Sequence, residues 1–124
     1  MRSIGAILLA ATVTASALTQ ATYVRAATKY DGAWSVVIYT RSGQCDAAYR
    51  FSGQITNGII SYSGAFSVDF SGRVRPGGAA WARVSSGANY ALASGHMTVT
   101  RGGGVWHGQG PNGRCAGTWV ATRT

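Results

Sequence analysis

The sequence predicts an all-β protein, a small antiparallel up-and-down β-barrel of about eight strands with one disulfide. Three observations support this fold class: apolar and polar residues alternate along most of the chain, turn signals recur at short intervals, and no window has helical i, i+3, i+4, i+7 spacing. The composition agrees, because the 124 residues include 18 glycines and no glutamate, a poor mixture for helices.

Residues 1–26 are expected to be a signal peptide that precedes the fold. Arg2 comes before an apolar stretch over residues 4–18, shorter than the roughly 20 residues that span a bilayer. Ala15-Ser16-Ala17 fits the A-x-A cleavage pattern, and Val24-Arg25-Ala26 is a second candidate. An uncleaved anchor is the less favoured alternative. Residues 27–124 would then be a single β-barrel domain, exported to the periplasm or the extracellular space and not membrane-spanning.

The cysteines agree with export. Cys45 and Cys115 are the only two, and an exported chain folds in an oxidising compartment, so we expect one disulfide between them. No further cysteine or ligand cluster suggests a redox or metal role. Closing a loop of about 70 residues stabilises a fold by roughly 4 kcal/mol in the chain-entropy model.

Strands are expected in sequence along the domain, beginning with the alternation of Trp34, Val36 and Ile38. The expected ranges are 33–40, 47–55, 59–64, 65–71, 73–75, 79–86, 89–100, 105–109 and 114–123. Gly53 is expected to mark a bend or bulge, and Gly95 is a candidate break.

Turn signals separate these segments. Asn57-Gly58 lies between two apolar runs, which is the strongest short hairpin signal. Further reversals are predicted at residues 76–78, 87–89, 102–104 and 111–113. Short turns without long crossovers favour an up-and-down barrel over a sandwich.

A Gly-x-Trp unit occurs near both ends of the domain, at residues 32–34 and 117–119, and again at 104–106. Pairing of the first strand with the last would close the barrel and remove its exposed edges. The aromatic candidates for the barrel interior are Trp34, Tyr49, Phe51, Trp81, Tyr90 and Trp119, with Phe66 and Phe70 beside them.

Several markers occur in order: Asp-Gly-x-Trp-Ser-Val at 31–36, Cys45, and Cys-x-Gly-Thr-Trp-x-Ala-x-Arg at 115–123. On these residues the chain resembles a family of small exported proteobacterial β proteins with no established activity. The resemblance covers nearly all of residues 27–124; it implies a shared β fold and transfers no catalytic residue. A looser similarity in size, disulfide and barrel plan links the chain to lipocalin and avidin-like barrels and to small bacterial metalloprotease inhibitors.

The sequence predicts no enzyme, no cofactor and no metal site. Asp31, Asp46 and Asp69 are the only acids, and they form no convincing carboxylate pair. His96 and His107 are expected at surface strand positions, without a Gly-x-Ser-x-Gly elbow or a diagnostic metal spacing. The glycines at 102–104 lack the Gly-Lys-Ser/Thr ending of a phosphate loop.

Positive charge is the one strong bias, with a net charge of +8. Arg73 and Arg75 flank Val74, so both should project from one face of a strand. Together with Arg50 and Arg83 they are the candidate anion-binding residues, because guanidinium groups fit carboxylates, phosphates and sulfates. The expected partners are an anionic envelope polymer, an acidic protein or a small amphipathic ligand, with no specific nucleic acid. A basic surface that serves solubility alone is the alternative.

We therefore expect a small secreted, non-catalytic β-barrel binding protein with a basic surface and an anionic or amphipathic ligand. The alternatives are an inhibitor-type protein, acting on an exported enzyme through a loop or an N-terminal arm at about residues 27–31, and a purely structural envelope protein. An eight-stranded barrel is just wide enough to be filled by side chains or to hold one small ligand. A large inward cavity would favour the binding protein.

Overall fold

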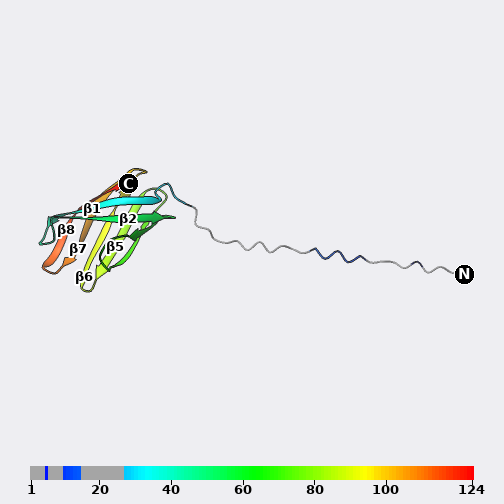
Figure 1. Ribbon diagram of the computed structural model, residues 1–124, viewed down its shortest axis with the longest axis horizontal. Coiled ribbons are helices and arrows are strands. Elements are labelled where there is room, and N and C mark those ends of the chain that lie inside the picture. The colour runs from blue at the N-terminus through cyan, green and yellow to red at the C-terminus, as the bar shows by residue number, and fades with distance from the viewer. Residues whose placement is uncertain (1–4, 6–9, 15–26) are drawn as a thin grey trace.

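Residues 27–124 form a closed antiparallel barrel in which each strand pairs with its sequence neighbours and the last strand pairs with the first (Figure 1). The computed structural model describes residues 5, 10–14 and 27–124, so both candidate cleavage sites of the expected signal peptide lie outside the described residues. The expected all-β up-and-down barrel is confirmed. Among the described residues there is no helix long and apolar enough to cross a membrane.

The eight strands differ in length and run alternately up and down the barrel. They are β1 (Gly32–Ser42), β2 (Ala48–Thr56), β3 (Ile59–Tyr62), β4 (Asp69–Val74), β5 (Ala79–Ser86), β6 (Asn89–Met97), β7 (Arg101–Gly110) and β8 (Gly113–Arg123).

The predicted hairpin turn at Asn57-Gly58 is confirmed. Both residues have positive φ angles, 53° and 79°, the conformation that a two-residue turn needs to match the twist of its strands.

The predicted strands over 65–71 and 73–75 are wrong in their boundaries: the single strand β4 replaces them, and residues 65–68 belong to a loop. The ring of Phe66 lies 6.0 Å from that of Tyr49, so it packs on a side chain of β2 instead of extending the β3–β4 ladder.

The reversal predicted at residues 102–104 is also wrong. These glycines lie inside β7, and the chain turns at 98–100, where the Thr98 hydroxyl accepts a hydrogen bond from the Arg101 amide at 3.1 Å. The glycines are needed for close packing, because a Cβ on Gly104 would lie 2.6 Å from Cα of its partner Gly95. Strand β6 is unbroken at Gly95.

Gly53 pairs regularly without the expected bulge, and the register shift occurs between Thr40 and Ser42.

Tryptophan side chains fill the barrel interior against these glycines. Trp106 lies opposite Gly117, and Trp119 lies opposite Gly104, in the β7–β8 pair. A Cβ on Gly117 would come within 2.9 Å of the Trp106 Nε1 atom, and one on Gly95 within 2.7 Å of the Trp119 ring. Two of the three Gly-x-Trp units, at 104–106 and 117–119, therefore pair so that the glycine of each lies opposite the tryptophan of the other.

Each buried indole N–H also finds a backbone acceptor, as burial of a polar group requires. Trp34 donates to the carbonyl of Tyr30 at 2.8 Å. Trp106 donates to the carbonyl of Tyr39 at 2.9 Å, and Trp119 donates to that of Ser94 at 3.0 Å. These bonds fix the orientation of the rings in the core.

One end of the barrel is closed by residues 28–31, and we call it the closed end. The Asp31 carboxylate accepts hydrogen bonds from the Thr28 hydroxyl at 2.6 Å and from the amides of Asn57 and Gly58 at 2.8 and 3.1 Å. The Thr28 hydrogen bond contributes most to lowering the pKa of Asp31 to about 2, and the two amide bonds add to the effect.

Arg123 holds the same segment from the other side. Its guanidinium group donates to the carbonyls of Asp31, Lys29 and Val99 at 2.6, 2.8 and 2.7 Å, and it lies 4.7 Å above the Trp34 ring. The core of the closed end is apolar and fully buried, and consists of Tyr30, Trp34, Ile55, Val74, Ala80, Met97 and Ala121.

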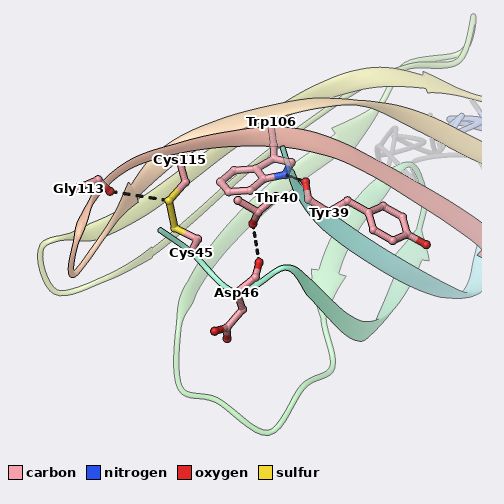
Figure 2. The surroundings of a disulfide bond; sticks show 7 residues. All are labelled: Tyr39, Thr40, Cys45, Asp46, Trp106, Gly113 and Cys115. Atoms are coloured by element: carbon pink, nitrogen blue, oxygen red, sulfur yellow. Dashed lines mark hydrogen bonds between the residues drawn. A yellow bond between two sulfur atoms is a disulfide. The ribbon is translucent and has the colours of Figure 1, made fainter. Parts of the chain in front are cut away.

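The disulfide lies at the opposite end and confirms the expected pairing. Cys45 and Cys115 have Cα atoms 6.1 Å apart and tie the β1–β2 connection to the start of β8. Figure 2 shows the Trp106 indole beside the disulfide, with its N–H directed at the Tyr39 carbonyl. The Thr40 hydroxyl donates to the Asp46 carbonyl at 2.5 Å, which also holds this connection in place.

Replacing Gly117 by alanine should destabilise the barrel, because the new methyl group would overlap the Tyr39 carbonyl and crowd the Trp106 indole. Overpacking of this kind costs about 1–3 kcal/mol. Gly53→Ala is the matched control, since an inward Cβ there would meet only the Ser61 carbonyl oxygen, at 3.6 Å. Urea unfolding should show a lower midpoint for Gly117→Ala alone, and equal midpoints for the two variants would contradict the packing argument.

Reduction of the disulfide should lower the free energy of unfolding by about 4 kcal/mol, because the bond closes a loop with a sequence separation of 70 residues. Urea unfolding with and without reductant measures this difference. Mass spectrometry of the protein purified without reductant should detect no free thiol. Two free thiols at Cys45 and Cys115 in that protein would refute the bond.

Candidate functional site

The end of the barrel opposite residues 28–31 is built differently, and we call it the open end. The strand connections at 43–47, 63–68, 87–88 and 111–112 surround it. Apart from the buried Trp106 and Cys115, most inward-facing side chains in this half are only half-buried, unlike those of the closed end. They include Val36, Ile38, Tyr49, Phe51, Tyr62, Phe70, Ala82, Val84, Ala91 and Ala93.

Five rings form a continuous cluster on one side of the open end, and we call it the aromatic wall: Tyr49, Phe51, Tyr62, Phe66 and Phe70. Neighbouring ring centroids lie between 5.5 and 6.1 Å apart, within the range of favourable aromatic pairs. The Tyr49 and Tyr62 hydroxyls are hydrogen-bonded at 3.1 Å. Phe66 is 63% exposed, so the wall continues to the surface through the 63–68 loop.

The β5–β6 side of the open end carries small inward side chains and has a cavity of about 230 Å³. Val84, Ala91, Trp106 and Cys45 contribute its apolar lining, and Tyr90 stands at its edge. A cavity of about 150 Å³ is enough to admit benzene. This space can therefore take an apolar group of about one ring.

A second cavity, of about 380 Å³, lies beside the first near the start of β8. His107, Arg114 and Ser42 give it polar and cationic groups, and Tyr90 lines both cavities. Of the two disulfide cysteines, Cys45 lines the first cavity and Cys115 lines the second. An apolar space and a basic space thus meet at the rim of the open end.

The predicted interior aromatics divide into two groups. Trp34 and Trp119 are buried, and Tyr49 and Phe51 face inward at the open end, in agreement with the prediction. The assignment of Trp81 and Tyr90 to the interior is wrong, since they are 44% and 39% exposed on the outer surface. On β5 the inward positions belong to the small Ala80 and Ala82, so the larger Trp81 points outward.

Trp106 is an interior residue that sequence reasoning missed. Its ring is buried and lines the cavity of the open end. The signal was present, because residues 104–106 repeat the Gly-x-Trp unit of two other strands whose tryptophans were assigned to the interior. Tyr62 was missed as well, although it follows Ile60 with the spacing of a strand face.

The candidate anion-binding arginines fall into two places. Arg73 and Arg75 project outward with Val74 buried between them, and Arg83 lies on the neighbouring strand. Arg50 lies apart on β2, where it donates to the Ser35 hydroxyl at 3.4 Å. The structure therefore brings Arg73, Arg75 and Arg83 together and leaves Arg50 out.

The histidines do not form a site with each other. Both are exposed, and His107 lies opposite Leu92, four residues along β6 from His96. Within the described residues no group of three or more histidine, cysteine or acidic side chains could hold a metal ion. No protein-family model, curated protein or solved structure matches this chain. Function must accordingly be argued from the geometry.

The hydrogen bond between the Tyr49 and Tyr62 hydroxyls is the largest cause that raises the pKa of Tyr49 from 10.0 to about 12, followed by desolvation. Neutral Tyr49 therefore stabilises the fold below pH 10, and this contribution is lost as the pH rises through 12. Ultraviolet titration of tyrosinate should show a late-ionising phenol that is absent from Tyr49→Phe. In Tyr62→Phe the Tyr49 phenol should ionise earlier, and an unchanged titration would refute the hydrogen bond.

Proposed function

We propose that this protein is a secreted, non-catalytic binding protein that takes the apolar part of a small amphipathic ligand into the open end of its barrel. The observation that carries the proposal is the difference between the two ends. Residues 28–31 fill the closed end, whereas the open end has half-buried aromatic side chains and a cavity of about 230 Å³. Concave, mainly apolar sites with a few polar groups at the rim are typical of small-molecule binding.

The charge around the open end supports an anionic head group on that ligand. Arg114 and His107 line the outer cavity, which adjoins the interior cavity at Tyr90. A ring buried in the interior cavity would leave its polar substituent at this rim. A guanidinium group there suits a carboxylate, sulfonate or phosphate. Secretion is supported by the disulfide, because such bonds persist in oxidising compartments.

The inhibitor alternative has less support from the chain's geometry. An arm at about residues 27–31 would need to project, but Asp31 and Arg123 hold residues 28–31 against the barrel. Only the loop form of that hypothesis is left, in which the exposed Phe66 would enter an enzyme cleft. The half-buried interior beneath that loop favours a ligand that enters the barrel.

Ala91→Phe should block binding, because the new ring would occupy the cavity that Ala91 lines. The probe is anilinonaphthalene sulfonate, an aromatic anion whose fluorescence rises in apolar surroundings. Burial of a ring contributes about 1.5–3 kcal/mol, so the affinity should fall about tenfold or more. Titration of fluorescence at constant salt measures the dissociation constant.

The matched control is Ala33→Phe, which adds the same ring at an exposed position of β1 near the closed end. It should bind the probe like the wild-type protein. Circular dichroism and the melting temperature verify that both variants are folded. Equal affinities for wild type, Ala91→Phe and Ala33→Phe would refute a site in the open end.

A further inference from the structure

Trp81 is exposed on the outside of the barrel, at the third position of β5, and is not part of the buried core. It lies opposite Arg73 on β4 and opposite Ser94 on β6. The residue is 44% exposed to solvent. Tryptophan is enriched in binding surfaces, because a large rigid ring provides contact area at a small cost in conformational entropy.

Arginines surround this ring on the outer face of β4 and β5. Arg73 and Arg75 are alternate residues, about 6.8 Å apart along the chain direction. Arg83 lies opposite Ser71, at the position diagonal to Arg73, and such diagonal neighbours are about 7–8 Å apart. We call Arg73, Arg75, Trp81 and Arg83 the arginine-tryptophan face.

These guanidinium groups are not engaged in the fold. The guanidinium groups of Arg50 and Arg123 donate hydrogen bonds to other residues, but those of Arg73, Arg75 and Arg83 donate none to the residues that the structure describes. Arg73, Arg75 and Arg83 are all exposed. The face therefore presents three guanidinium groups that are free to donate hydrogen bonds, arranged around the exposed indole of Trp81.

We propose that the arginine-tryptophan face binds an acidic polysaccharide. One sugar ring would stack its C–H face on the Trp81 indole, and the carboxylates of neighbouring sugars would accept hydrogen bonds from Arg73, Arg75 and Arg83. Guanidinium forks match carboxylates, and their spacing of about 7 Å suits a polymer with repeated anionic groups. This site lies outside the barrel and is independent of the one at the open end.

Two observations favour a polysaccharide over a nucleic acid as the ligand of this face. The disulfide indicates an oxidising compartment, where carboxylated sugar polymers are common polyanions. Single-stranded nucleic acids are also bound by stacking successive bases on several aromatic residues along a groove. The arginine-tryptophan face has one indole on the convex outside of a barrel.

Binding to polygalacturonate, a carboxylated sugar polymer, tests the proposal by affinity electrophoresis or calorimetry at low salt. Inorganic polyphosphate supplies charge without rings, and methyl-esterified polygalacturonate supplies rings without charge. The wild-type protein should bind both charged polymers. Esterification of polygalacturonate should abolish its binding. The double variant Arg73→Ser/Arg75→Ser should weaken binding to both, whereas the control Arg50→Ser should change neither by more than about twofold.

Trp81→Ala separates stacking from charge. It should weaken polygalacturonate binding about tenfold and leave polyphosphate binding unchanged, while Trp81→Phe, which keeps a ring, should retain most of the affinity. Binding of anilinonaphthalene sulfonate and the melting temperature should be unaffected in both variants, which verifies the fold and the independence of the two sites.

Three outcomes would overturn the proposal. Equal losses in Arg50→Ser and in the double variant would mean that the attraction comes from diffuse charge. Unchanged polygalacturonate binding in Trp81→Ala would remove the stacking platform. Tighter binding of single-stranded DNA than of polygalacturonate, with loss in Trp81→Ala, would assign the face to nucleic acid.

Discussion

The indoles of Trp106 and Trp119 fit into the barrel interior because the residues next to them on neighbouring strands are glycines, which have no side chain to occupy that space. The β6–β7 and β7–β8 pairs can then approach closely, and each indole N–H reaches a backbone carbonyl. Two rings of this size fill much of a narrow eight-stranded barrel. The hydrogen bond from Trp106 to β1 and the Trp106 lining of the cavity both depend on this packing of tryptophan against glycine.

The same packing gives the barrel two unlike ends. Near the C-terminus, the Arg123 guanidinium group binds backbone carbonyls of the segment before β1. The Asp31 carboxylate of that segment binds the amides of Asn57 and Gly58 in the β2–β3 turn, so that the segment is held over this end of the barrel. At the other end the disulfide holds the β1–β2 connection beside Trp106, and Cys45 and Trp106 line the cavity there. This difference between the two ends is the basis of the proposed ligand site.

Strand β5 serves both proposed sites through its two faces. Its inward residues Ala82 and Val84 are small, which leaves room at the open end. Its outward residues Trp81 and Arg83 are large and exposed, and they complete the arginine-tryptophan face with β4. The distribution of size along one strand, small inside and large outside, reverses the usual placement of bulky apolar residues.

The sequence by itself determined the all-β class, the Asn57-Gly58 hairpin and the disulfide, because alternation, turn chemistry and cysteine pairing are local or compositional signals. Only the tertiary structure decided which face of β5 is inside, since a period of two defines two faces without saying which one meets the core. It also decided that residues 102–104 extend a strand, because glycine suits both a turn and close backbone packing, and only the Trp119 ring and β6 distinguish the two. The cavity depends on the sum of side-chain volumes across several strands, which no local pattern contains.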